Sequence, residues 1–82
     1  MQDNRVGVVG ILIEERGSAH EINSVLGEHQ DIIVGRVGIP YRERGLSVIS
    51  LIIDGSTDQI GAMTGKLGTL RGVKVKTALL SK

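Results

Sequence analysis

The chain has 82 residues, with ten Lys and Arg against nine Asp and Glu, and a formal net charge of +1 at neutral pH. This balance gives no general electrostatic attraction to nucleic acid or to an anionic membrane surface. The absence of cysteine excludes disulfides and thiolate metal sites. The length corresponds to one domain, residues 1–82, and a chain this short buries only about 60–65% of its unfolded surface. No signal peptide or membrane span is present, so we expect a cytoplasmic protein.

The first strand is expected over residues 5–13 (RVGVVGILI), where both faces carry aliphatic side chains. An apolar run of this kind is typical of a central strand. A short loop containing Gly17 follows. Ser18 is then expected to cap a helix, with Glu21 as its capping-box partner.

The second strand is expected over residues 31–37. Residues 35–45 are interpreted as the long loop of a central hairpin, because glycines punctuate them and because Pro40 has no N–H to donate to a neighbouring strand. A β-branched third strand follows the loop and ends at Gly55.

A second helix is expected to begin after a cap at Ser56 or Thr57 and to stop at Gly68. The last strand, residues 73–79, alternates lysine with apolar side chains. The resulting βαββαβ order predicts an α+β, ferredoxin-like fold with a four-stranded antiparallel sheet. We expect strands one and three at its centre and both helices on one face.

Such a fold leaves the second face of the sheet without helices, although strands one and three place aliphatic side chains there. An uncovered patch of this kind usually marks an interaction surface, so we expect a homo-oligomer, either a dimer or a tetramer. The edge formed by the second strand, with Ile32, Ile33 and Val34, is a second candidate contact. The alternative is that short surface loops cover the patch.

The candidate ligand or interface residues fall into two groups. Arginine forks suit carboxylates, phosphates or an acidic partner, and exposed amides at a helix N-terminus can hold an anion. Each group also has a simpler interpretation: the arginines of the hairpin as a solvated tip, and the residues before the helix as an ordinary turn. The candidates are Gly17 and Ser18 before the first helix, and Arg36, Tyr41, Arg42 and Arg44 in the hairpin.

Several classes of function find no support in the sequence. No catalytic motif is present, so we expect no enzyme. His20 and His29 lie nine residues apart on one predicted helix, on opposite sides, so we expect no metal site within one protomer. Tyr41 is the only aromatic residue, which argues against base stacking and direct nucleic-acid binding. Gly61 and Gly65 are expected to permit close helix packing.

Residues 35–50 (GRVGIPYRERGLSVIS) closely resemble the iron-only hydrogenase system regulator family. The resemblance extends to Arg5 and Val6, to residues 65–68 and to Gly72 and Val73. It implies a stand-alone ACT-like domain with a ferredoxin fold, similar to the C-terminal ligand-sensing domain of nickel-responsive transcription regulators. The nickel regulators' DNA-binding arm and His/Cys ligand set have no counterpart here. The likeness to ACT domains implies that Gly17 corresponds to a position usually near their ligand.

The resemblance implies a regulatory module that senses a small molecule at a subunit interface and acts on transcription or enzyme assembly through an unknown protein partner. A second hypothesis is an interaction scaffold without a ligand, which docks a partner through the arginine-rich hairpin. The sequence identifies no cofactor and leaves the ligand unnamed.

Overall fold

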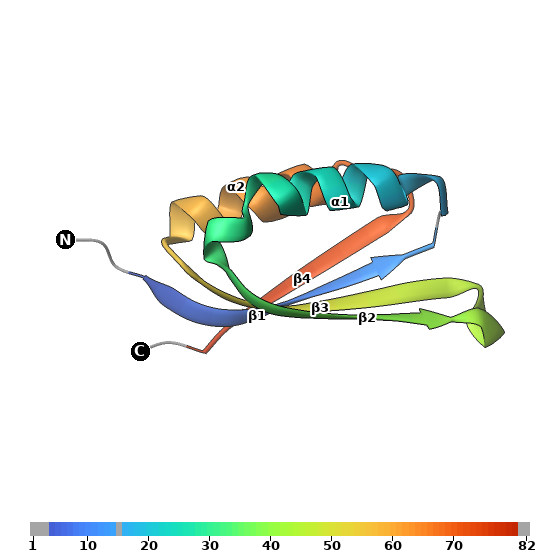
Figure 1. Cartoon of the computed structure of the whole chain (residues 1–82), viewed down its shortest axis with the longest axis horizontal. Helices are drawn as coiled ribbons and strands as arrows, with labels where there is room; N and C mark the ends of the chain where they lie inside the picture. The colour runs from blue at the N-terminus through green and yellow to red at the C-terminus, as the bar shows by residue number, and fades with distance from the viewer. Residues whose placement is uncertain (1–3, 15, 81–82) are drawn as a thin grey trace.

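Four antiparallel strands form one sheet in the order β2-β3-β1-β4, and both α-helices lie on the same side of it (Figure 1). The computed structural model describes residues 4–14 and 16–80. These results confirm the α+β, ferredoxin-like prediction, with the first and third strands at the centre. The elements are β1 (Arg5–Ile13), η1 (Arg16–Ser18), α1 (Ala19–Glu28), η2 (Gln30–Ile32), β2 (Ile33–Tyr41), η3 (Arg42–Arg44), β3 (Leu46–Gly55), α2 (Thr57–Gly68) and β4 (Val73–Leu79).

The core lies between the sheet and the two helices. Because side chains alternate across a strand, the odd-numbered residues of β1 and β3 face the helices and their even-numbered neighbours face away. Val9, Leu51 and Ile53 are completely buried on the helix side, and Ile49 lies there too. The apolar stripes of the helices complete this core with Ile22, Leu26, Ile60, Met63 and Leu67.

The β2–β3 connection is much shorter than the sequence predicts. β2 continues to Tyr41, and Pro40 lies within it, opposite Ser47 of β3. Proline is tolerated on β2 because this strand forms the edge of the sheet, where an N–H can be missing without breaking an inner ladder. The expected loop of residues 35–45 is therefore wrong for most of its length. Only the single turn of η3 and Gly45, with φ of 67°, connect the strands.

The two helices begin differently. At α2, Ser56 Oγ accepts from Gln59 N at 3.1 Å and Gln59 Oε1 accepts from Ser56 N at 2.9 Å, which completes a capping box. At α1, Ser18 occupies the cap position but makes no side-chain cap bond, so the box predicted with Glu21 does not form. Ser18 Oγ instead donates to the carbonyl oxygen of Arg71 at 2.6 Å. The buried hydroxyl thus connects the start of α1 to the turn that follows α2, at one end of the helical layer.

Gly7 of β1 and the glycines of α2 have different surroundings. A Cβ atom on Gly7 would lie 2.7 Å from the carbonyl oxygen of Ala78, so the approach of β4 to β1 requires glycine there. Gly61 and Gly65 of α2 are different, because a Cβ atom on either would meet no atom within 4 Å. The close helix packing predicted for these two glycines is therefore not found within the described chain.

We predict opposite effects of alanine at these two kinds of position. Gly61→Ala and Gly65→Ala should each raise the free energy of unfolding by about 0.5–1 kcal/mol, because alanine restricts the unfolded chain and favours helix. Gly7→Ala, the matched control, should lower it because the added methyl group meets the backbone of β4. Thermal and urea unfolding of the three variants measure these changes. A loss of stability in both α2 variants would contradict the open environment of these glycines.

Candidate functional site

The face of the sheet that the helices leave uncovered carries most of the exposed apolar side chains. Val37 and Ile39 are each 59% exposed, and Ile52 is 42% exposed. The strand register explains this clustering, since Ile39 pairs with Val48 and Tyr41 pairs with Leu46. Paired residues point to the same side of a sheet. We call this surface the helix-free face; its apolar members are Val8, Leu12, Val37, Ile39, Tyr41, Leu46, Val48 and Ile52.

A hollow of about 460 Å³ lies where the β2–β3 turn approaches the end of β1 and the start of α1. Arg42 and Pro40 line it from the hairpin, and Glu14 and Ala19 line it from the β1–α1 connection. A basic and an acidic residue therefore line the same hollow. This combination suits a small polar molecule that carries both an acidic and a basic group.

The two predicted residues before α1 differ in what they can contact. Gly17 is exposed, and neither a positive φ nor a nearby atom requires glycine there. Ser18 is only 6% exposed, and its hydroxyl donates a hydrogen bond to the carbonyl oxygen of Arg71. Ser18 thus holds two connections together. Of its two exposed neighbours, Ala19 lines the hollow and Gly17 does not.

The predicted arginines do not form one cluster. Arg36 lies on the side of β2 that faces the helices, and its Nη2 donates to Asn23 Oδ1 of α1 at 3.1 Å. Arg42 lies beyond Tyr41, the last residue of β2. At about 3.3 Å per residue, Tyr41 is roughly 16 Å from Arg36 along the strand. Tyr41, Arg42 and Arg44 are all exposed around η3, and Tyr41 also belongs to the helix-free face.

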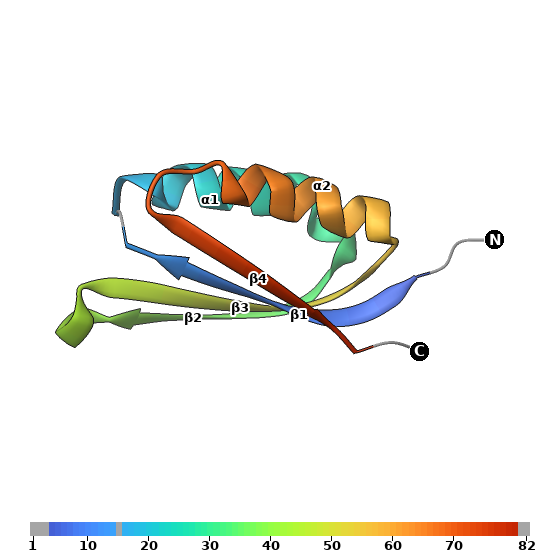
Figure 2. The same ribbon diagram turned by 180° about the vertical axis from the view of Figure 1, so that it is seen from behind.

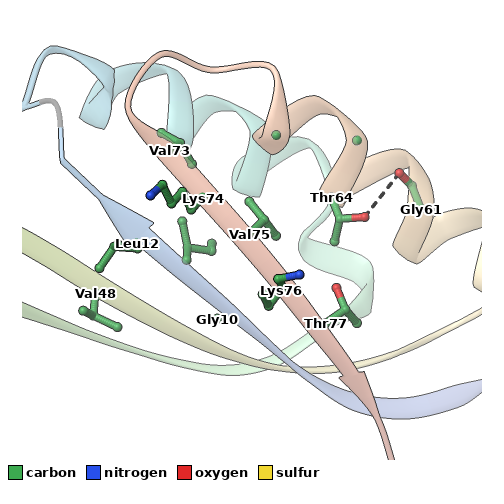
Figure 3. A pocket seen from close by; sticks show the side chains of 13 residues that line it. Gly10, Leu12, Val48, Gly61, Thr64, Val73, Lys74, Val75, Lys76 and Thr77 are labelled. Atoms are coloured by element: carbon green, nitrogen blue, oxygen red, sulfur yellow. Dashed lines mark hydrogen bonds between the residues drawn. The ribbon is translucent and has the colours of Figure 1, made fainter.

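A larger hollow, of about 880 Å³, follows the outer edge of β4 and was not predicted from the sequence. Figure 3 shows Thr64 of α2 on one side of this strand and Leu12 and Val48 on the other. Gly61 and Gly65 also line the hollow. The one signal that could have revealed it was the spacing of glycines along α2, which the analysis assigned to packing inside the chain.

Residues 4–14 and 16–80 contain no group of three or more His, Asp or Glu side chains placed to hold a metal ion. They also contain no helix that is long and apolar enough to cross a membrane. His20 is exposed on α1, whereas Nε2 of His29 is buried and has no hydrogen-bond partner within this part of the chain.

Solved structures with the same fold range from a close relative to distant ones. Protein TM1266 from Thermotoga maritima, described as uncharacterized, is 38% identical and superposes with a TM-score of 0.90, over 96% of this chain and 100% of that one. An unknown protein from Galdieria sulphuraria is 13% identical with a TM-score of 0.70, over 98% of this chain and 47% of that one. The PII-like protein CPII from Thiomonas intermedia, bound to ADP, AMP and bicarbonate, is 11% identical with a TM-score of 0.53, over 93% and 94% of the two chains.

Among curated proteins, none matches this chain. The profile of the TM1266-like family, described as "Iron-only hydrogenase system regulator, putative", matches residues 5–77. This range extends from the first residue of β1 almost to the end of β4. Together with the likeness to TM1266 over nearly the whole chain, it confirms the resemblance found in the sequence. The chain belongs to the TM1266-like family of iron-only hydrogenase system regulators.

Proposed function

We propose that this protein is a cytoplasmic, homo-oligomeric regulatory module that senses a small molecule at a subunit interface. It acts through a partner protein, on transcription or enzyme assembly, in the regulation of an iron-only hydrogenase system. Membership of a family of regulators supports the regulatory role. Residues 1–82 form one ACT-like domain in this proposal, and its work is binding rather than catalysis.

The observation that carries the proposal is the helix-free face. Folded proteins rarely leave so many neighbouring aliphatic side chains exposed unless another surface covers them. Its centre, around Val48, contains no charged residue. Asp54 follows Ile52 on this side of β3 at one end of the face, and Lys74 and Lys76 lie toward its β4 side. Two copies stacked face to face would bury each other's aliphatic side chains and leave these lysines at the rim.

The proposed ligand site is the hollow between Arg42 and Glu14. Tyr41 on the helix-free face directly precedes Arg42, so a second copy seated on that face would border the hollow. The acidic and the basic residue that line it favour a small molecule with one acidic and one basic group. ADP, AMP and bicarbonate, which CPII binds, belong in the test panel because the two proteins share a fold.

A second candidate function is a scaffold without a ligand that docks its partner through the hairpin turn. The order of this turn favours it, because η3 forms a helical turn that Gly45 ends in the left-handed conformation. Arg42 and Arg44 would then present guanidinium groups in a fixed arrangement to acidic groups of a partner. Thermal-shift measurements with small molecules separate the two functions, since only the sensor is stabilised by one of them.

We predict that Ile52→Asp dissociates the oligomer and leaves the protomer folded. The carboxylate would be desolvated in the proposed contact, whereas it stays hydrated on a separate protomer because Ile52 is 42% exposed. Ile53→Asp is the matched control: it lies one residue further along β3, is completely buried on the opposite face, and should unfold the domain. Light scattering at micromolar concentration and circular dichroism report assembly and folding separately. A monomeric unsubstituted protein would refute assembly through this face.

We further predict that Arg42→Ala combined with Arg44→Ala weakens assembly, ligand response or partner binding without unfolding the protomer. A charge-assisted contact shielded at an interface contributes roughly 1.5–3 kcal/mol, whereas a fully exposed one contributes almost nothing. Lys66→Ala is the control, because it removes a positive charge from an exposed ion pair with Glu28 elsewhere. If the double variant keeps its assembly state, its thermal shifts and its partner binding, the turn is only a connection.

A further inference from the structure

The outer edge of β4 presents backbone groups to which the sheet gives no partner. Glu14 N donates to Gly72 O at 2.7 Å, and Leu80 N donates to Val6 O at 2.8 Å. In an antiparallel ladder such pairs recur at every second residue, so the even-numbered residues of β4 bond to β1. Val75, Thr77 and Leu79 therefore direct their N–H and C=O groups outward. β4 is the last strand of the sheet, so these groups meet no further strand.

The space beside this edge can accept side chains. The hollow of about 880 Å³ runs along β4, and Figure 3 shows side chains that line it. On the helix side it is bordered by α2, which lies beside β4 (Figure 2). Gly61 and Gly65 keep that border open, although glycine destabilises a helix and no described atom needs the space they leave. Val73 and Val75 give the hollow an apolar floor. An added strand would place every second side chain into this hollow.

The other side of the same edge is positively charged. Lys74 and Lys76 pair with Leu12 and Gly10, so they lie on the opposite side of the sheet from α2. Both are exposed, and neither forms an ion pair with another described residue. If two copies paired through β4 in antiparallel fashion, the lysines of both would lie on one face and repel each other. The charge therefore disfavours a second copy and favours acidic side chains.

The opposite edge of the sheet is less suited to an added strand. β2 has a register shift between Ile33 and Gly35, which leaves Val34 as a bulge. Pro40, near its other end, supplies no N–H. β4 has neither interruption along Val73–Leu79. Of the two edges, β4 therefore offers the longer uninterrupted ladder.

We propose that the β4 edge binds an extended segment of a partner protein in which acidic residues alternate with apolar ones. The segment adds a fifth strand to the sheet: its backbone pairs with Val75, Thr77 and Leu79, and its acidic side chains lie beside Lys74 and Lys76. Its apolar side chains fill the hollow against Gly61 and Gly65. Backbone pairing provides the affinity and the alternating side chains provide the selectivity. The inference supplies the docking surface for the partner in the proposed function, at a place separate from the hairpin turn.

The test uses the unsubstituted protein and blocked synthetic peptides as long as β4. The first peptide alternates Glu with Val, the second alternates Lys with Val, and the third is the Glu–Val peptide with N-methyl groups on every second residue. Of these three peptides, we expect only the first to cause saturable changes in the amide NMR signals of Val75, Thr77 and Leu79. In the third peptide, the N-methyl groups replace the N–H groups that would donate to β4. A fourth peptide, methylated at the alternate positions, keeps these donors and should still bind.

Two variants examine the charge and the hollow separately. Lys74→Glu with Lys76→Glu should weaken binding of the Glu–Val peptide by about tenfold or more and should create binding of the Lys–Val peptide. Gly61→Leu with Gly65→Leu should abolish binding while the protein stays folded, because both positions open into empty space. Ala62→Leu, on an exposed position of α2 that does not line the hollow, is the matched control and should bind as before.

The proposal is wrong if the Glu–Val peptide causes no saturable change up to about 1 mM, a concentration that detects even weak complexes. It is also wrong if both charge types bind equally, if the N-methylated peptides bind alike, or if the signal changes lie away from β4. Light scattering of the same samples reports the assembly state of the protein. Loss of peptide binding with an intact oligomer would refute the docking edge alone, and a monomer that binds the peptide would refute only the proposed assembly.

Discussion

The structure depends on a mismatch between a sheet with two apolar faces and a helical layer that covers only one. β1 and β3 are aliphatic on both sides because they are the central strands, and α1 and α2 together bury one of those sides. The hydrophobic effect, at about 25 cal/mol for each Å² of apolar surface, acts on the uncovered side as well. Within residues 4–14 and 16–80, no third α-helix is present to cover that side. The exposed helix-free face and the hollows at the margins of the sheet follow from this incomplete covering by the helices.

The core that results is thin and built almost wholly from aliphatic side chains. The chain contains no Phe or Trp, so the separation between helices and sheet is set by Ile, Leu, Val and Met. Thin layers bring backbones close together, as the short distance between a Cβ atom on Gly7 and the backbone of β4 shows. They also leave gaps at the margins, where the helices do not reach over the edge strands. The hollows beside Arg42 and along β4 both lie at such margins.

Much of the fold could be predicted because hydrophobic alternation determines it. The limits of β1 and β4 and the end of α2 at Gly68 agree with the sequence analysis, and so does the central position of the two doubly apolar strands. The hairpin was misjudged because Pro40 was interpreted as a loop residue, although an edge strand tolerates it. The role of Ser18 was misjudged for a different reason: a local motif predicts a cap, but the carbonyl that accepts its proton, on Arg71, is 53 residues away in the chain. The edge position of a strand and a hydrogen bond between distant residues produce no periodic pattern in a sequence, so neither could be predicted from it.

The hydrogen bond between Ser18 and Arg71 also has a mechanical consequence. Ser18 follows directly after Gly17 at the start of α1, and Arg71 lies two residues before β4 begins. The bond from Glu14 N to Gly72 O joins the same two connections a second time. A buried hydroxyl cannot exchange its partner for water without cost, so the two bonds hold the two connections together at one corner of the fold. Glu14, which lines the hollow beside Arg42, is thereby fixed against the residues that lead into β4.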